Sequence, residues 1–307
     1  MASEVAWEYP HVLRVYKDGR VERLRGTEIV PPRHDSETGI RCMDVVFSPE
    51  KRLSARFFLP SVKDDQTQKL PLVIYIHGGA FCIESPFSSL YYDHLVPLCS
   101  RGNVMIVAIE YRRAPESVLP AAYEDSWEAI QWVASHTDGE GPHSWINRYA
   151  DLEKVFFVGD SAGGNIVHTM GIRASTGELP AGFKLRGMVF VHPYFEDGDE
   201  ARLKILDRIY PTMKGWDDPM INPVGAGAEH LASLKCSKVL VCVAGDDRLV
   251  GNAGVKYYEG LKNSGWEGGL QLMVSEGEDH IFHLKNPKSE KAKEVINKVV
   301  AMIHNAC

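Results

Sequence analysis

Residues 154–172 have the sequence Lys-Val-Phe-Phe-Val-Gly-Asp-Ser-Ala-Gly-Gly-Asn-Ile-Val-His-Thr-Met-Gly-Ile, and the pattern within them is the clearest indication of the fold. The apolar run Val155–Val158 predicts a buried strand, and residues 165–173 predict a helix. Gly159-Asp-Ser161-Ala-Gly163 lies between them, so Gly-x-Ser-x-Gly stands between a strand and a helix. Such a turn strains its serine, exposes the hydroxyl above the sheet and aims helix N–H groups at whatever it attacks. Taken alone, the motif also fits a glycine-rich turn with an incidental serine.

Bulk composition restricts the kind of protein this is. The chain has 307 residues, a formal net charge of -7 and a pI of about 6.0, which argues against nucleic acid or an anionic membrane as partner. Its six cysteines form no Cys-x-x-Cys pair, so neither a metal site nor a redox motif is expected. The start of the chain lacks signal-peptide features, and no apolar run is long enough to span a bilayer. We therefore expect a reducing, cytoplasmic location.

Apolar runs alternate with helical patterns along the chain, which predicts a doubly wound α/β sheet. Two strands and a hairpin around Asp18-Gly19 precede this alternation. We expect one domain over residues 1–307, with 1–40 as an N-terminal extension that folds over the active face. The predicted strands are 42–49, 53–59, 72–77, 105–109, 155–158, 187–192, 239–244 and 270–274, and the clearest helices are 121–134 and 289–304.

Polar side chains follow three of the predicted strands. Ser161 follows 155–158, Asp246 and Asp247 follow 239–244, and His280 follows 270–274. In a doubly wound sheet these positions share the carboxyl edge, where ligands bind. Singly, each has an ordinary explanation, such as a helix cap for the aspartate. Together, in the order Ser, Asp, His used by α/β-hydrolases, they predict a nucleophile, an acid and a base.

Small residues follow the strand at 72–77 as well. In His77-Gly78-Gly79-Ala80-Phe81 the backbone N–H groups can approach a substrate carbonyl and stabilise the negative charge that develops on its oxygen. We expect Gly78, Gly79 and Ala80 to form this oxyanion hole together with the N–H of Ala162. The alternative is an ordinary turn, which its place before Gly-x-Ser-x-Gly disfavours.

Taken jointly, six motifs resemble those of the plant carboxylesterases of the hormone-sensitive-lipase type. The resemblance runs nearly end to end and implies an α/β-hydrolase fold with a mostly parallel sheet, a partly helical cap and no cofactor or metal. It implies Ser161 as nucleophile, His280 rather than His283 as base, and Asp247 rather than Asp246 as acid. The last choice follows because the family's acid sits two residues before a leucine, here Leu249. The motifs are residues 16–23, 77–81, 110–116, 159–165, 218–223 and 277–283.

The chain departs from the family pattern at two places. Ala80 stands where the family usually has a third glycine, which is tolerable unless that residue must have positive φ. Residues 196–210, within the cap elements expected at 196–230, are short and highly charged, so we expect a more open site.

The expected activity is hydrolysis of a small or medium carboxylic ester. The resemblance also extends to hydroxyisoflavanone dehydratases and alkaloid cyclases, which act on plant specialised metabolites, and these remain the alternative. Gibberellin receptors share the fold but have lost the histidine, which disfavours a receptor here because His280 is present.

Overall fold

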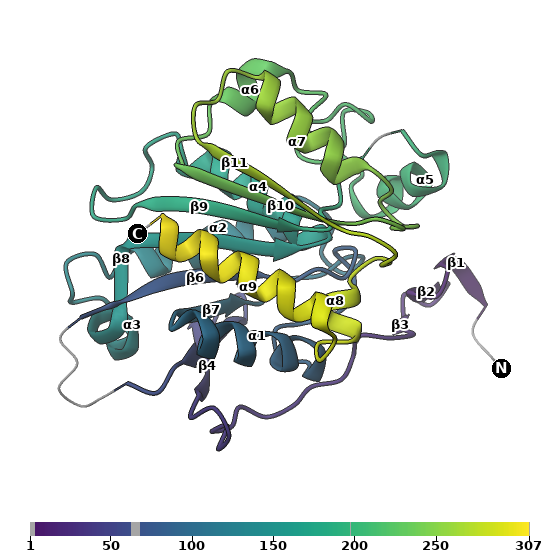
Figure 1. The fold of residues 1–307 in the computed structure, drawn as a ribbon. Coiled ribbons are helices and arrows are strands. Elements are labelled where there is room, and N and C mark those ends of the chain that lie inside the picture. The colour runs from purple at the N-terminus through teal and green to yellow at the C-terminus, as the bar shows by residue number, and fades with distance from the viewer. Residues whose placement is uncertain (1–3, 63–67, 197, 307) are drawn as a thin grey trace.

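The computed structural model describes residues 4–62, 68–196 and 198–306, and a large mixed sheet forms its centre (Figure 1). Its strands lie in the order β11-β10-β9-β8-β6-β7-β5-β4. All neighbours from β11 to β7 are parallel, whereas β5 is antiparallel to both β7 and β4. The predicted α/β class with a mostly parallel sheet is therefore confirmed. The strands are β4 (Arg41–Ser48), β5 (Leu53–Leu59), β6 (Leu70–Ile76), β7 (Met105–Ile109), β8 (Ala150–Asp160), β9 (Leu185–Val191), β10 (Lys238–Ala244) and β11 (Gly269–Ser275).

Helices cover both faces of this sheet, since its central strands are apolar on both sides. On β6, Val73 and Tyr75 pack into one core, whereas Leu72, Ile74 and Ile76 pack into the other. One face carries α1 (Ser89–Gly102), α8 (Phe282–Lys285) and α9 (Glu290–Asn305); the other carries α2 (Ala121–Ala134), α4 (Ala162–Ala174), α6 (Ala228–Ala232) and α7 (Ala253–Asn263). A short helix, α3 (Ser144–Tyr149), precedes β8. Within the described residues, no helix is long and apolar enough to cross a membrane.

The strand order reverses between β6 and β8, and this reversal places the site. The chain leaves β6 through α1 to β7 and then returns across β6 to β8, so the carboxyl ends of β6 and β8 lie side by side. Ile76 pairs with Gly159, which brings the turn after Ile76 against the turn at Ser161. Crevices at such reversals bind ligands in open α/β sheets.

Glycine is required on both sides of Ser161 because backbone atoms lie too close to leave room for a Cβ. A Cβ on Gly163 would lie 2.0 Å from the Ile76 carbonyl oxygen, and one on Gly159 would lie 2.5 Å from the Gly163 carbonyl oxygen. Helix α4 begins at Ala162, directly after Ser161, whereas the sequence predicted a start at residue 165. The difference arises because Gly163 and Gly164 have poor helix propensity but pack tightly here.

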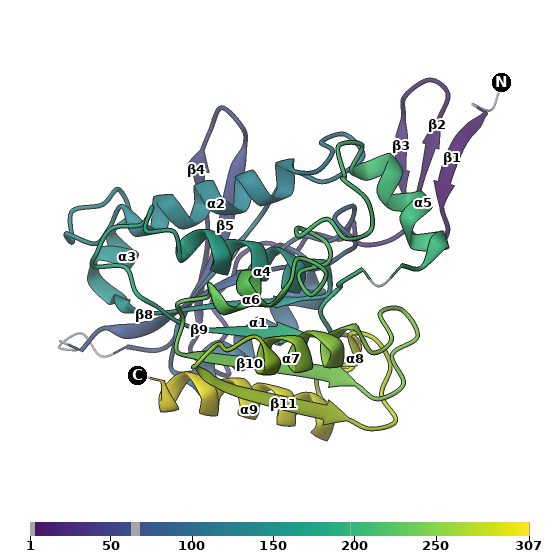
Figure 2. The ribbon, with the colours of Figure 1, turned by 90° about the horizontal axis from the view of Figure 1, so that it is seen from above.

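A second, three-stranded sheet precedes the main one. It comprises β1 (Val5–Tyr9), β2 (Leu13–Tyr16) and β3 (Val21–Arg23), all antiparallel, so the predicted hairpin is confirmed. Arg23 anchors it, with Nε donating to the Cys82 carbonyl at 2.7 Å and two N–H groups donating to Glu116. Figure 2 shows this sheet at one end of the molecule beside α5 (Glu200–Ile209), a helix that the sequence did not predict.

Candidate active site

Ser161 lies at the sharp turn between β8 and α4. Its backbone has φ 50° and ψ −120°, the strained geometry expected of the nucleophile on such a turn. The hydroxyl is 2.9 Å from Nε2 of His280, and both side chains are largely buried. The serine can therefore donate its proton to the imidazole, provided that Nε2 carries none.

Asp247 determines which nitrogen of His280 carries the proton. Its Oδ2 lies 2.7 Å from Nδ1 of His280, while its Oδ1 accepts from the N–H groups of Leu249 and Val250 at 3.0 and 2.9 Å. A carboxylate only accepts, so Nδ1 is protonated and Nε2 is free to accept from Ser161. Burial opposes ionisation of Asp247, but the hydrogen bond from His280 and those from the two backbone N–H groups outweigh it, so the pKa of Asp247 is lowered.

Asp246 and His283, which the sequence analysis disfavoured as acid and base, lie outside this hydrogen-bonded chain. Asp246 is exposed, and its backbone N–H donates to the Glu278 carbonyl. His283 is fully buried, with its ring against the rings of His94 and His192 at centroid distances of 5.0 and 5.1 Å. The structure thus brings Ser161, His280 and Asp247 together and keeps the neighbouring acid and histidine out of this hydrogen-bonded chain.

The turn after β6 differs from the expectation at Gly78. The Gly78 N–H donates to the Tyr91 hydroxyl at 2.8 Å, so it is already engaged and does not serve as an oxyanion donor. In the part of the chain that the structure describes, the N–H groups of Gly79 and Ala80 have no acceptor. Ala162, as the first residue of α4, likewise has an N–H without a partner in the helix. These three groups are the donors that remain available beside Ser161.

Ala80 has a positive φ, the conformation that is unfavourable for an alanine at the position where the family usually has glycine. Its φ is 53°, in the left-handed region, which costs roughly 1–2 kcal/mol for a residue with a Cβ. Gly79 before it has φ 98°, and a Cβ there would lie 2.1 Å from the Ile83 carbonyl oxygen. The turn therefore requires glycine at 79 and holds an alanine under strain at 80.

A buried carboxylate next to the nucleophile connects the two turns. Asp160 accepts from the hydroxyls of Tyr75 at 2.9 Å and Tyr91 at 3.0 Å, and Tyr91 in turn accepts from Gly78. Burial raises the pKa of Asp160 to about 7, against the effect of both tyrosine hydrogen bonds. Asp160 stands inside the Gly-x-Ser-x-Gly motif, but no sequence pattern indicates its role, because its partner Tyr91 lies on α1, a helix that the sequence did not predict.

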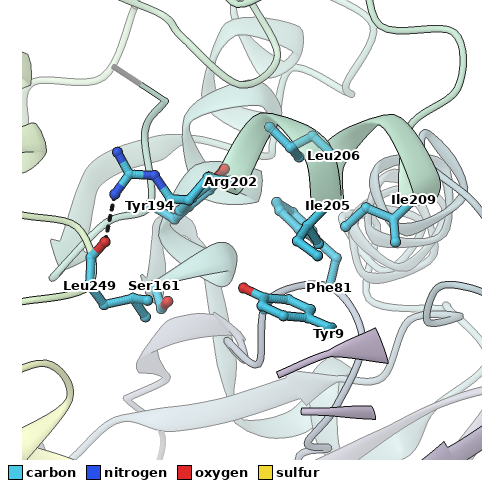
Figure 3. Close-up of a pocket in the computed structure, with 10 residues that line it drawn as sticks. Tyr9, Phe81, Ser161, Tyr194, Arg202, Ile205, Leu206, Ile209 and Leu249 are labelled. Atoms are coloured by element: carbon cyan, nitrogen blue, oxygen red, sulfur yellow. Dashed lines mark hydrogen bonds between the residues drawn. The ribbon is translucent and has the colours of Figure 1, made fainter. Parts of the chain in front are cut away.

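Two cavities meet at Ser161. The smaller, of about 30 Å³, lies under α5; the larger, of about 530 Å³, extends past His280. Tyr9, from the N-terminal sheet, lines both. Figure 3 shows the smaller cavity, with Ile205 projecting from α5 toward Tyr9 and Phe81. Helix α5 therefore closes the site on this side, contrary to the more open site expected because the 196–210 segment is short.

One cluster has the composition of a metal site. Ligand-capable atoms of His192, Asp247 and His280 lie within 4.8 Å of one another. His280 is already bonded through both ring nitrogens, and His192 accepts the Ile281 N–H at Nδ1, which leaves its proton on Nε2. A cation bound here would have to break these bonds and displace that proton, so hydrogen bonding is the arrangement that the residues fit.

Comparisons with known proteins cover almost the whole chain. A family model described as the alpha/beta hydrolase fold matches residues 73–284. Probable carboxylesterase 5 of Arabidopsis thaliana is 46% identical, over 99% of this chain and 99% of the relative. A 2-hydroxyisoflavanone dehydratase of Glycyrrhiza echinata is 41% identical, over 98% of this chain and 97% of the relative. Among solved structures, brefeldin A esterase, a bacterial homologue of human hormone-sensitive lipase, matches with a TM-score of 0.71 at 17% identity, covering 91% of this chain and 80% of its own.

Proposed function

The chain belongs to the α/β-hydrolase family, and on this premise we propose that it cleaves small or medium esters through an acyl-enzyme on Ser161. Its similarity to the plant carboxylesterases of the hormone-sensitive-lipase type makes it a carboxylic ester hydrolase. The observation that supports the proposed mechanism best is the continuous chain of hydrogen bonds from Ser161 through His280 to Asp247, at 2.9 and 2.7 Å.

In this proposal His280 acts twice. Nε2 takes the Ser161 proton as the hydroxyl attacks the ester carbon, and it then gives that proton to the leaving alcohol. Asp247 holds the imidazole in the required tautomer and stabilises the imidazolium that forms. A water molecule then repeats the sequence and releases the acid.

The negative charge that develops on the carbonyl oxygen needs fixed donors. We assign them to the N–H groups of Gly79 and Ala80, in the turn after β6, and of Ala162, at the start of α4, none of which has an acceptor within the described residues. Asp160 and Tyr91 are positioning residues in this scheme, because they hold Gly78 and hence the turn that carries two of the donors.

We propose that a cap covers the site. The N-terminal sheet and α5 both contribute side chains to the cavity next to Ser161, Tyr9 from the first and Ile205 from the second. We also place the protein in the cytoplasm, a reducing compartment, which is supported by the free thiols of the five described cysteines.

Covalent labelling tests the mechanism. A fluorophosphonate should form an adduct on Ser161, and acid quench during turnover of a slow ester should trap an acyl group on the same residue. Ser161→Ala should lose both adducts and its ester turnover. An adduct on another serine, located by mass spectrometry, would contradict the proposal.

A second candidate function rests on the dehydratase relative, which is 41% identical over nearly all of its length. Elimination of water needs a proton acceptor such as His280 but no bond to Ser161. Under that alternative, Ser161→Ala would keep turnover of the natural substrate and no acyl group would be trapped. The same two measurements therefore separate hydrolysis from elimination.

A further inference from the structure

The two cavities at Ser161 differ greatly in size and share one boundary. Tyr9, Ala80, Ser161 and Leu249 line both, so the ester carbon attacked by Ser161 sits at their junction. One half of the ester must therefore occupy the cavity of about 30 Å³ and the other half the cavity of about 530 Å³.

The position of His280 determines which cavity holds the alcohol half of the ester and which holds the acyl half. It lines only the larger cavity, together with Ile281 and Lys285. Because Nε2 of His280 must hand its proton to the leaving oxygen, that oxygen has to lie on the His280 side of Ser161. The alcohol half therefore faces the larger cavity, and the acyl half faces the smaller cavity under α5.

The smaller cavity has little room and firmly held walls. Leu206 and Ile209 of α5 and Phe81 are nearly inaccessible to solvent. Hydrogen bonds hold the helix at both ends. Arg202 donates to the Leu249 carbonyl at 2.7 Å (Figure 3). The Leu119 N–H donates to the Ile209 carbonyl, also at 2.7 Å. This cavity of about 30 Å³ is far smaller than the one of about 530 Å³, so it takes only a short acyl group such as acetyl or propionyl.

Resting on the esterase function proposed above, we infer that the substrates are acetyl or propionyl esters of a bulky alcohol, and not methyl esters of a bulky acid. The larger cavity, of about 530 Å³, has room for an aromatic alcohol, and its lining is both apolar and charged, since it includes Leu90 and Tyr91 as well as Arg25 and Glu84. Ile205, which projects from α5 toward Phe81, sets the length of the acyl group.

Two isomeric esters with the same bulky group test the inference. In naphthylethyl acetate the naphthyl group is on the alcohol side, whereas in methyl naphthylpropanoate it is on the acyl side, and neither leaving group is activated. We expect kcat/KM for naphthylethyl acetate to exceed that for methyl naphthylpropanoate, and that for naphthylethyl hexanoate, by about tenfold or more. Equal rates, or preference for the methyl ester, would overturn the inference.

Two variants on α5 test the role of the acyl wall. Ile205→Ala should raise the hexanoate-to-acetate ratio of kcat/KM by about tenfold or more. Leu203→Ala is the matched control, since Leu203 is also half-buried on α5 but does not line the cavity, and it should leave the ratio unchanged. An unchanged ratio in Ile205→Ala would refute the acyl assignment.

The same rates also distinguish failure of the substrate inference from failure of the proposed esterase function. Hydrolysis of all three esters with the wrong preference overturns the substrate class alone. Failure to hydrolyse any of them, combined with no fluorophosphonate adduct on Ser161, overturns the esterase proposal itself.

Discussion

Asp247→Asn is the substitution whose effect the structure specifies most closely. Asp247 uses its two oxygens differently: Oδ1 accepts from two backbone N–H groups, and Oδ2 accepts from His280. In the variant, the amide oxygen must stay at the Oδ1 position, because an amide nitrogen there would face two N–H donors. The new NH₂ group is therefore forced against His280, where it donates to Nδ1.

The magnitude follows from the tautomer. With Nδ1 accepting, the proton of the neutral imidazole moves to Nε2, which can then no longer take the proton of Ser161. Loss of the correct tautomer in a serine hydrolase costs about 10⁴ in kcat, or about 5.4 kcal/mol of barrier. The Oδ1 hydrogen bonds to Leu249 and Val250 persist, so the fold should tolerate the change.

Steady-state kinetics with an aryl acetate, together with a thermal melt, measure both effects. We expect kcat to fall by about 10⁴ with little change in melting temperature. Asp246→Asn is the matched control, because its side chain is exposed one position away, and it should keep nearly full activity. A loss of less than about tenfold in Asp247→Asn, or a larger loss in Asp246→Asn, would refute the reasoning.

Two further predictions concern the buried carboxylate beside the nucleophile. Tyr91→Phe should lower kcat more than Tyr75→Phe, with little change in KM. Both variants lose one hydrogen bond to Asp160, but only Tyr91→Phe also leaves the buried Gly78 N–H without an acceptor, which costs roughly 1–3 kcal/mol. Equal effects of the two variants on kcat would contradict this. Because burial raises the pKa of Asp160 to about 7 in the folded protein, the stability that this group contributes is complete at low pH and is lost as the pH rises from about 4 through 7. Denaturation with urea should therefore show the stability of Asp160→Asn rising relative to the unsubstituted protein across that range, and a constant difference would be evidence against a raised pKa.

Much of the site could be predicted from the sequence because the catalytic residues follow predicted strands of a parallel sheet. Ser161, His280 and the aspartate pair each follow an apolar run within a few residues, and parallel strands bring their carboxyl ends to one edge. The choice between Asp246 and Asp247 needed a family resemblance, since both follow the same strand. The structure separates them physically, because only Asp247 has its carboxylate turned inward to His280.

Other parts of the site depend on contacts between distant segments and carry little sequence signal. Tyr91 reaches Gly78 and Asp160 only because α1 packs on the strand face that bears Tyr75. Residues 200–209 have a helical pattern of apolar side chains, but their high charge resembles that of a solvated loop. Their role as the wall of the smaller cavity comes from docking over Phe81 and Tyr9, which no local pattern predicts.

Several residues near Ser161 have strained backbone conformations, and hydrogen bonds keep the turns that contain them in place. Such residues cost roughly 1–3 kcal/mol each and persist only where their surroundings determine them. The Ser161 N–H donates to the Val191 carbonyl, the His192 N–H donates to the Cys242 carbonyl, and Ile281 donates to the His192 ring. The strained turns after β8, β9 and β11 are thus bonded to neighbouring strands or to one another, so nucleophile and base need not reorganise as charge develops. In the turns that follow β6, β8, β9 and β11, the non-glycine residues with positive φ are Ala80, Phe81, Glu84, Ser161, His192 and Ile281.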